Sequence, residues 1–403
     1  MNTLRSYISI ESASAILLFV GAVLALCISN TPLYDEYVSL INLPISFSIG
    51  ELTLSKSLIK WINDGFMALY FLLLTLETKF HLLEGNLIDK SHIKLATIAA
   101  CGGVLMPAII YYGFAYADPV LAKGWAIPIA TDTAFVLGAL SFFKTKIPIS
   151  ARIFVVFLSI IDDVIAISIL AVFYTSTLHF FPLLISCVFL AFLGTLNFFN
   201  VRSLSPYIFI GFFLWFSIIE TGIHGTIAGV LVALFIPLRI RRNTHRFPSP
   251  LKKLERILHP FVSFIILPIF AFLNTEISFK EINFNDLFSP ITLGIISGLF
   301  LGKQIGIILS SFVFLKFSKA NLPYGLNWSA FWAIGMLCGI GFTFSLFIGL
   351  LSFDNPVLIN QMKLGVIIGS VFSAVVGMIL LRCGASSSYD DKIPNSLPEK
   401  GKV

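Results

Sequence analysis

The chain has 403 residues, of which 57% are apolar and 12% are charged, and its formal net charge is +6. A soluble chain carries roughly twice that share of charged residues, so the composition excludes an ordinary soluble protein. The absence of a GxxxxGK[ST] loop argues against a nucleotide-driven pump. The basic residues lie in short loops, where membrane topology explains them without nucleic acid. The five cysteines are scattered, and their spacing predicts neither a resident metal site nor a disulfide framework.

Apolar runs long enough to cross a bilayer as helices recur about twelve times along the chain. Lipid offers no partner for backbone groups, so the spanning segments must be helical. The predicted fold class is therefore an all-α polytopic membrane protein, with one transmembrane domain over residues 1–383 and the lipid bilayer as its surroundings. The predicted spans are 12–30, 60–79, 95–115, 124–143, 150–174, 180–199, 205–219, 222–238, 257–274, 290–315, 327–350 and 361–382.

Two segments outside the spans are distinctive. Between the first two spans, ISFSIGELTLS (Ile45–Ser55) alternates apolar and polar residues around Gly50 and Glu51. This pattern predicts a small extracytoplasmic β-hairpin, with a coil on the membrane surface as the alternative. After the last span, residues 384–403 are polar and are predicted to form a disordered cytoplasmic tail.

Lysine and arginine gather in the loops after the second, fourth, eighth and tenth predicted spans. Loops of the opposite parity contain fewer basic residues. The positive-inside rule then predicts that both termini are cytoplasmic.

Few charged residues interrupt the spans, and each costs roughly 2.5–3.5 kcal/mol at the bilayer centre. Successive helix residues diverge by about 100°, so the adjacent Asp162 and Asp163 cannot point the same way. We expect one to face an aqueous cavity and the other a neighbouring helix. A packing salt bridge would explain one aspartate but not all of these charges, which favours a functional site. The charged residues are Asp132, Asp162, Asp163 and Lys303, with Asp64 nearer a span end.

The fourth and eleventh predicted spans contain features that interrupt a helix. In WAIPIATDTAFVLG, Pro128 removes a backbone donor shortly before the polar triplet TDT. In CGIGFTFS, two glycines flank Ile340. A simple proline kink is the packing alternative for the fourth span. Two interrupted spans in different halves of the chain indicate a transporter site near the membrane midplane.

Small residues recur at a spacing of four in the tenth and twelfth spans. Such stripes let helix backbones approach closely, and the first stripe indicates that Lys303 lies in the protein interior. The stripe residues are Gly294, Gly298, Gly302, Gly306, Gly365, Gly369, Ser373 and Gly377.

Several segments, in this order, resemble the NhaA-type sodium/proton antiporter family over nearly the whole chain: WINDGFMALYFLLLTLETK, WAIPIATDTAFVLG, SIIDDVIAI, GIHGTIAGV, LERILHP, LGKQIGI and LCGIGFTFSLFI. The resemblance implies a secondary antiporter rather than an enzyme, with no cofactor. Such a protein exchanges cytoplasmic Na+ or Li+ for external protons electrogenically, by competition at buried aspartates with alternating access. The family is a standard example of inverted repeats with broken helices.

The resemblance also implies how the chain is organised. Residues 95–174 and 290–382 would form the inverted repeat, with the two broken helices crossing at the midplane. Residues 12–79 and 205–274 would form the interface side of a homodimer that associates through Ile45–Ser55. The protein would lie in the bacterial inner (plasma) membrane.

By the same resemblance, Asp162 and Asp163 would bind the transported Na+ and protons, with help from Thr131 and Asp132. Asp132 would also compensate the positive ends of the half-helices, and Lys303 the negative ends. In the ion-free form, Lys303 would pair with Asp162.

A pH switch is implied at Glu77, Glu255 and His224. Phe80 and His81 depart from the family pattern after LE-x-K and leave the pH profile open. His224 has an ordinary packed histidine as its alternative, and Glu255 has a weak surface ion pair.

Two other functions use buried acids. A sodium-coupled solute symporter would need an organic-substrate pocket, which the motifs do not indicate. An intramembrane aspartyl protease would share a proton between two acids, but no GxGD segment occurs and Lys303 would have no role.

Overall fold

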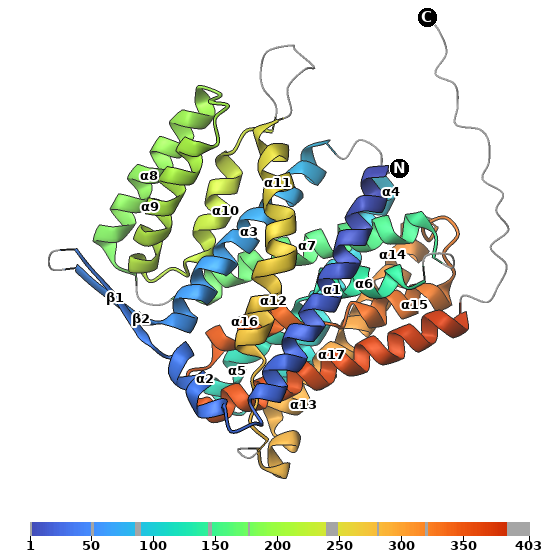
Figure 1. Cartoon of the computed structure of the whole chain (residues 1–403). Helices are drawn as coiled ribbons and strands as arrows, with labels where there is room; N and C mark the ends of the chain where they lie inside the picture. Colours follow the sequence, from blue (N-terminus) through green and yellow to red (C-terminus); the bar gives the residue numbers. More distant parts are fainter. Residues whose placement is uncertain are drawn as a thin grey trace, which may run out of the picture.

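The computed structural model describes residues 2–49, 52–84, 90–143, 147–175, 178–238, 249–279, 282–318 and 321–384. This part of the chain is nearly all helical, with one two-stranded sheet (Figure 1). The predicted hairpin is confirmed, since β1 (Pro44–Ile49) pairs antiparallel with β2 (Leu52–Ser57). Its predicted tip, Gly50 and Glu51, lies outside the described residues, as does the predicted tail beyond Gly384.

The helices of the first half include η1, which is a 3-10 helix. They are α1 (Asn2–Ile28), α2 (Tyr34–Ile41), α3 (Leu58–Glu84), α4 (Lys90–Ala115), α5 (Pro119–Ala122), η1 (Lys123–Ile129), α6 (Thr133–Ser141), α7 (Ile149–Phe173), α8 (Phe180–Phe198) and α9 (Ser205–Thr221).

The second half contains a short 3-10 helix, η3, and two π-helical turns, η2 and η4. Its helices are α10 (Thr226–Phe235), α11 (Pro250–Phe261), η2 (Val262–Ile266), α12 (Leu267–Asn274), η3 (Phe284–Phe288), α13 (Pro290–Ser297), η4 (Gly298–Gly302), α14 (Lys303–Ser318), α15 (Trp328–Leu337), α16 (Phe342–Ser352) and α17 (Pro356–Gly384).

Eight helices in the described chain are long and apolar enough to cross a membrane. The pair α15 and α16, bent by 43° at a short break, would make a ninth if it forms one span. Three apolar helices are shorter: residues 13–28 of α1, α9 and α10. The described chain therefore has the architecture of a multi-pass membrane protein, while the exact number of twelve spans stays a prediction.

The glycine stripe of the tenth predicted span lies at a close helix contact, as predicted. A Cβ atom added at Gly306 would overlap the carbonyl oxygen of Gly102 on α4, and one at Gly302 would lie 2.7 Å from Pro107 Cα. Backbone therefore touches backbone where α4 crosses the continuous segment α13–η4–α14. This contact carries Lys303 into the interior, where it is 0% exposed.

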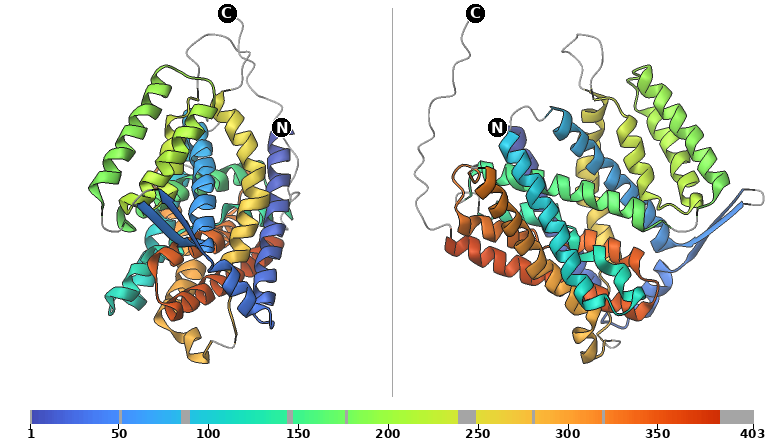
Figure 2. Two further views of the ribbon diagram at one scale, coloured as in Figure 1. Left: turned by 60° about the vertical axis from the view of Figure 1, so that its left-hand side comes forward. Right: turned by 180° about the vertical axis from the view of Figure 1, so that it is seen from behind.

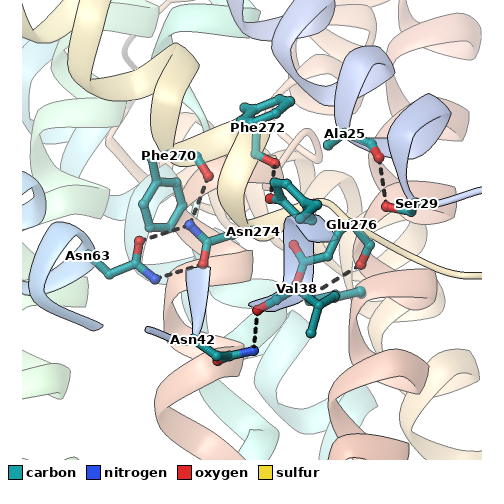
Figure 3. Close-up of polar contacts among 11 residues, drawn as sticks. Ala25, Ser29, Val38, Asn42, Asn63, Phe270, Phe272, Asn274 and Glu276 are labelled. Atoms are coloured by element: carbon teal, nitrogen blue, oxygen red, sulfur yellow. Dashed lines mark hydrogen bonds and ion pairs between the residues drawn. The ribbon is translucent and has the colours of Figure 1, made fainter. Parts of the chain in front are cut away.

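The end of α12 is tied to the start of α3 by two amide side chains (Figure 3). Asn63 and Asn274 each donate to the other, at 2.7 and 2.9 Å, and Asn274 also donates to the Phe270 carbonyl at 2.8 Å. Beyond this pair, Lys363 Nζ on α17 contacts Glu276 Oε1 at 2.7 Å. Polar contacts thus join α3, α12 and α17 at one end of the helices.

Helices α8, α9 and α10 lie together on one side of α3 (Figure 1). Helices α8 and α9 pack on each other, and α9 also contacts α10, which packs on α3. Figure 1 and the right-hand view of Figure 2 show the hairpin projecting from the helices on the side where α8 and α9 lie. At its base the hairpin contacts α3, where the Trp61 indole N–H donates to the Ile45 carbonyl at 3.1 Å.

We expect Gly306→Ala to destabilise the protein by about 1–3 kcal/mol, because the new methyl group forces α4 and α14 apart. The matched control is Gly113→Ala on α4, where a Cβ atom meets nothing within 4 Å. That change should be neutral or stabilising by about 0.5–1 kcal/mol, since alanine favours a helix. Unfolding in detergent measures both, and equal stabilities of the two variants would contradict the close packing.

Candidate functional site

Two interruptions of the helical backbone meet in the interior. Residues 130–132 between η1 and α6 are not helical, and residues 338–341 separate α15 from α16. The Asp132 N–H donates to the Ile340 carbonyl at 2.6 Å. Thr131 Oγ1 lies 2.9 Å from the Cys338 carbonyl oxygen and donates to it. Backbone groups freed by one break thus find partners at the other, as a water-poor interior requires.

Asp132 lies at the N-terminus of both half-helices that begin at these breaks. Its carboxylate accepts from the Phe135 N–H of α6 at 3.4 Å. It also accepts from the Thr343 N–H of α16 at 3.1 Å and from the Thr343 hydroxyl at 2.6 Å. Free N–H groups give a helix N-terminus partial positive charge, so a carboxylate is favourable there.

Lys303 contacts a helix C-terminus, where free carbonyl groups give a partial negative charge. Its Nζ donates to the Ile129 carbonyl at the end of η1, at 2.5 Å, and to Asp162 Oδ2, also at 2.5 Å. The Thr131 hydroxyl lies 2.9 Å from the same Asp162 oxygen. The π-helical turn η4 directly precedes Lys303, and such turns rotate the following side chains relative to a regular α-helix. The contact that the resemblance implied between Lys303 and Asp162 is therefore present.

Asp163 points away from this ion pair. It lines a cavity of about 80 Å³, which has room for several water molecules, between α3, α6, α7 and the α11–α12 segment. Asp132 and Glu77 line the same cavity, while Asp162 does not. The two adjacent aspartates therefore face different surroundings, as the helix geometry predicted.

The three residues implied for a pH switch do not lie together. Glu77 lines the cavity, and Glu255 is half-buried on α11. His224 lies instead beside Asp64, with Nε2 3.6 Å from Asp64 Oδ1, and Asp64 contacts Lys56 of β2 at 2.7 Å. Asp64 and Glu77 are separated by about 20 Å along α3.

The sequence reasoning missed His259 as a site residue. His259 lines the cavity, and its Nε2 lies 3.8 Å from Glu77 Oε1. The signal was present in LERILHP, because Glu255 and His259 are four residues apart and share one helix face. His81, noted as a departure from the family pattern, also lines the cavity.

Comparison with known proteins identifies the family of the chain. The chain matches the family described as Na+/H+ antiporter 1 over residues 5–381. The chain belongs to this family. The Na(+)/H(+) antiporter NhaA of Salmonella arizonae is 43% identical over 95% of this chain and 98% of its own length. The proteins of the same name from Salmonella typhimurium and Escherichia coli are 42% and 41% identical over the same shares of the chains.

Lys303→Met should lower the free energy of unfolding by about 3–5 kcal/mol, because Asp162 keeps a buried charge without its partner. Lys252→Met is the matched control: this lysine contacts Glu84 at 3.4 Å but its side chain is 44% exposed, so loss of the ion pair should cost at most about 1 kcal/mol.

Adding Asp162→Asn to Lys303→Met should restore part of the lost stability, because the double variant buries no unpaired charge. Unfolding in detergent measures all variants. A Lys303→Met protein as stable as the Lys252→Met control would show that the ion pair is not a structural constraint.

Proposed function

We propose that this member of the Na+/H+ antiporter 1 family is a secondary transporter that exchanges Na+, or Li+, for protons at Asp163. The observation that carries the proposal is that the adjacent Asp162 and Asp163 lie in different surroundings. Asp163 is 5% exposed and lines the cavity, whereas Asp162 is held by Lys303. One carboxylate is thus open to ions while its neighbour is already compensated.

The chemistry follows from the residue types. Na+ is a hard cation that takes oxygen ligands, and the Asp163 and Asp132 carboxylates offer them in the cavity. Asp162 and Thr131, which the resemblance also implies as ligands, do not line the cavity in this form. A carboxylate that binds a proton no longer offers the same charge to a cation. Sodium and protons therefore compete for Asp163, and the Lys303–Asp162 pair represents the ion-free form. If two protons are released for each Na+ bound, the exchange moves net charge.

Alternating access would come from the two proposed repeats. Residues 95–174 and 290–382 each contain a long helix, an interrupted helix and a second long helix. The hydrogen bond from Asp132 N–H to the Ile340 carbonyl joins their interruptions. This core would move against residues 12–79 and 205–274 and expose Asp163 to either side in turn. The basic loops support an orientation in the bacterial inner membrane with both termini cytoplasmic.

Family membership favours exchange over the two functions left open by the sequence, sodium-coupled symport and intramembrane proteolysis. The geometry also disfavours a shared-proton acid pair, because Asp132 is engaged by the N-termini of α6 and α16.

Regulation by pH is proposed for Glu77, Glu255 and His224. Glu77 forms one group with His259 and with Glu255, which lies four residues before His259 on α11, and His224 belongs to a second group. Glu77 and His259 face the cavity that contains Asp163, so a change in their charge acts on the ion path directly. His224 contacts Asp64 near the hairpin and would act through the position of α3. Substitution of each group separates direct from indirect effects on the pH profile.

A homodimer through Ile45–Ser55 is proposed as well. A two-stranded hairpin is marginally stable alone and leaves strand edges unpaired, so a second hairpin is a suitable partner.

Replacing residues 45–55 by two glycines should convert dimers to monomers while Na+-driven proton movement persists. Light scattering of the detergent-solubilised protein measures the mass. Asn42→Ala, which alters an exposed amide just before the hairpin, is the control. A dimer that survives the replacement refutes this interface.

Reconstituted vesicles test the exchange itself. Asp163→Asn should abolish Na+-driven proton movement, because the amide neither carries a proton nor compensates a cation. Asp118→Asn is the matched control, since Asp118 accepts from the Val120 N–H at the start of α5, outside the cavity. Sodium-induced proton release from the purified protein should also show a bell-shaped pH response that Asp163→Asn lacks. Full exchange by Asp163→Asn would exclude this carboxylate as the carrier.

A further inference from the structure

Two hydroxyl groups next to the aspartates have no hydrogen-bond partner among the described residues. Ser159 Oγ and Thr133 Oγ1 are both buried, and Ser159 is only 1% exposed. Both residues line the cavity that Asp132 and Asp163 also line. The cavity wall thus contains two neutral oxygens that could accept a ligand, and the Asp163 carboxylate lines the same cavity.

A buried hydroxyl without a partner is costly, so most buried hydroxyls find one. Three neighbouring hydroxyls do: Thr131 donates to the Cys338 carbonyl, Thr343 to Asp132, and Ser345 to the Ile127 carbonyl. Other unpartnered buried hydroxyls occur in the described chain. Ser159 and Thr133 differ from those outside the cavity in facing the same space as Asp163.

The positions of the two hydroxyls suit a shared ligand. Ser159 precedes Asp163 by four residues on α7, which is one helical turn on the same face. Thr133 directly follows Asp132 and is the first residue of α6. The oxygens therefore come from two helices that wall the same cavity. A third unpartnered hydroxyl at the cavity, Thr78, follows Glu77 on α3 and neighbours neither aspartate in sequence.

We propose that Ser159 and Thr133 are additional ligands of the transported Na+, which complete its coordination by the aspartates. The inference rests on the proposed exchange at Asp163. A hard cation that leaves water needs several oxygens, whereas a proton needs only one. Neutral hydroxyls therefore strengthen cation binding without adding a charge that would also hold the proton more tightly. They set the affinity for Na+ separately from the affinity for H+.

The test measures the KM for Na+ in reconstituted vesicles for Ser159→Ala, Thr133→Val and the double variant. Each single change should raise KM about tenfold, the size of one hydrogen bond to a charge, with the maximal rate within about twofold. Thr133→Ser keeps the hydroxyl and should leave the KM at its wild-type value. The matched controls are Ser168→Ala on α7 and Thr97→Val on α4, whose exposed hydroxyls donate to Val164 and Ile93 carbonyls.

Thermal unfolding separates a ligand from a structural role. In Na+-free buffer, Ser159→Ala and Thr133→Val should melt no earlier than the wild type, because the hydroxyls make no protein contact that is lost. The rise in Tm caused by adding Na+ should shrink. An unchanged KM in the double variant overturns the inference. A raised KM together with a lower Tm in Na+-free buffer also overturns it, because the hydroxyls would then have a structural role.

The same vesicles distinguish this inference from the proposed function. Absence of Na+-driven proton movement in the wild type, or its persistence in Asp163→Asn, refutes the exchange and the added ligands together. If the wild type and Asp163→Asn behave as proposed while the hydroxyl variants keep the wild-type KM, only the added ligands are refuted.

Discussion

The contact between Lys303 Nζ and Asp162 Oδ2 joins two charges that are both shielded from solvent. Removing either partner would leave an uncompensated charge in the interior, so each residue requires the other. The pair is also anchored by backbone, because Lys303 donates to the Ile129 carbonyl. This arrangement requires η1 to end at Ile129 and α14 to lie close to α4, which the glycine contact between Gly306 and Gly102 permits.

The same electrostatic logic accounts for Asp132. Interrupting a helix inside a membrane protein exposes polar ends that lipid cannot satisfy. Asp132 meets two N-terminal ends with one carboxylate, and Lys303 meets a carbonyl end with one ammonium group. Since these charges are committed to the helix ends and to each other, Asp163 is the aspartate whose charge is least compensated by neighbouring groups. This difference between the aspartates is the physical basis for proposing ion binding at Asp163.

Much of this arrangement could be predicted from the sequence, because each signal is local. Charges within apolar runs, the TDT and GIG interruptions, the glycine stripe and the alternating hairpin segment all depend on neighbouring residues. The contacts between distant segments could not be predicted in this way. The Asp132 to Ile340 hydrogen bond joins two separate spans, and His259 meets Glu77 only through the packing of α11 on α3. Composition likewise indicates that Ser159 and Thr133 are polar, but only packing determines whether their hydroxyls find partners.

The proposed competition between a cation and a proton at Asp163 has a physical consequence for the two affinities. Burial and the neighbouring charges govern how strongly Asp163 holds a proton, since both act on the charged form. The number of neutral oxygens around it governs how well the site replaces the water lost by Na+. If Ser159 and Thr133 bind Na+ as proposed, the affinities for Na+ and for the proton depend on different side chains, and either affinity can change without loss of the other. The buried pair of Lys303 and Asp162 stays outside this balance, because neither residue lines the cavity and both are tied to the backbone break by Ile129 and Thr131.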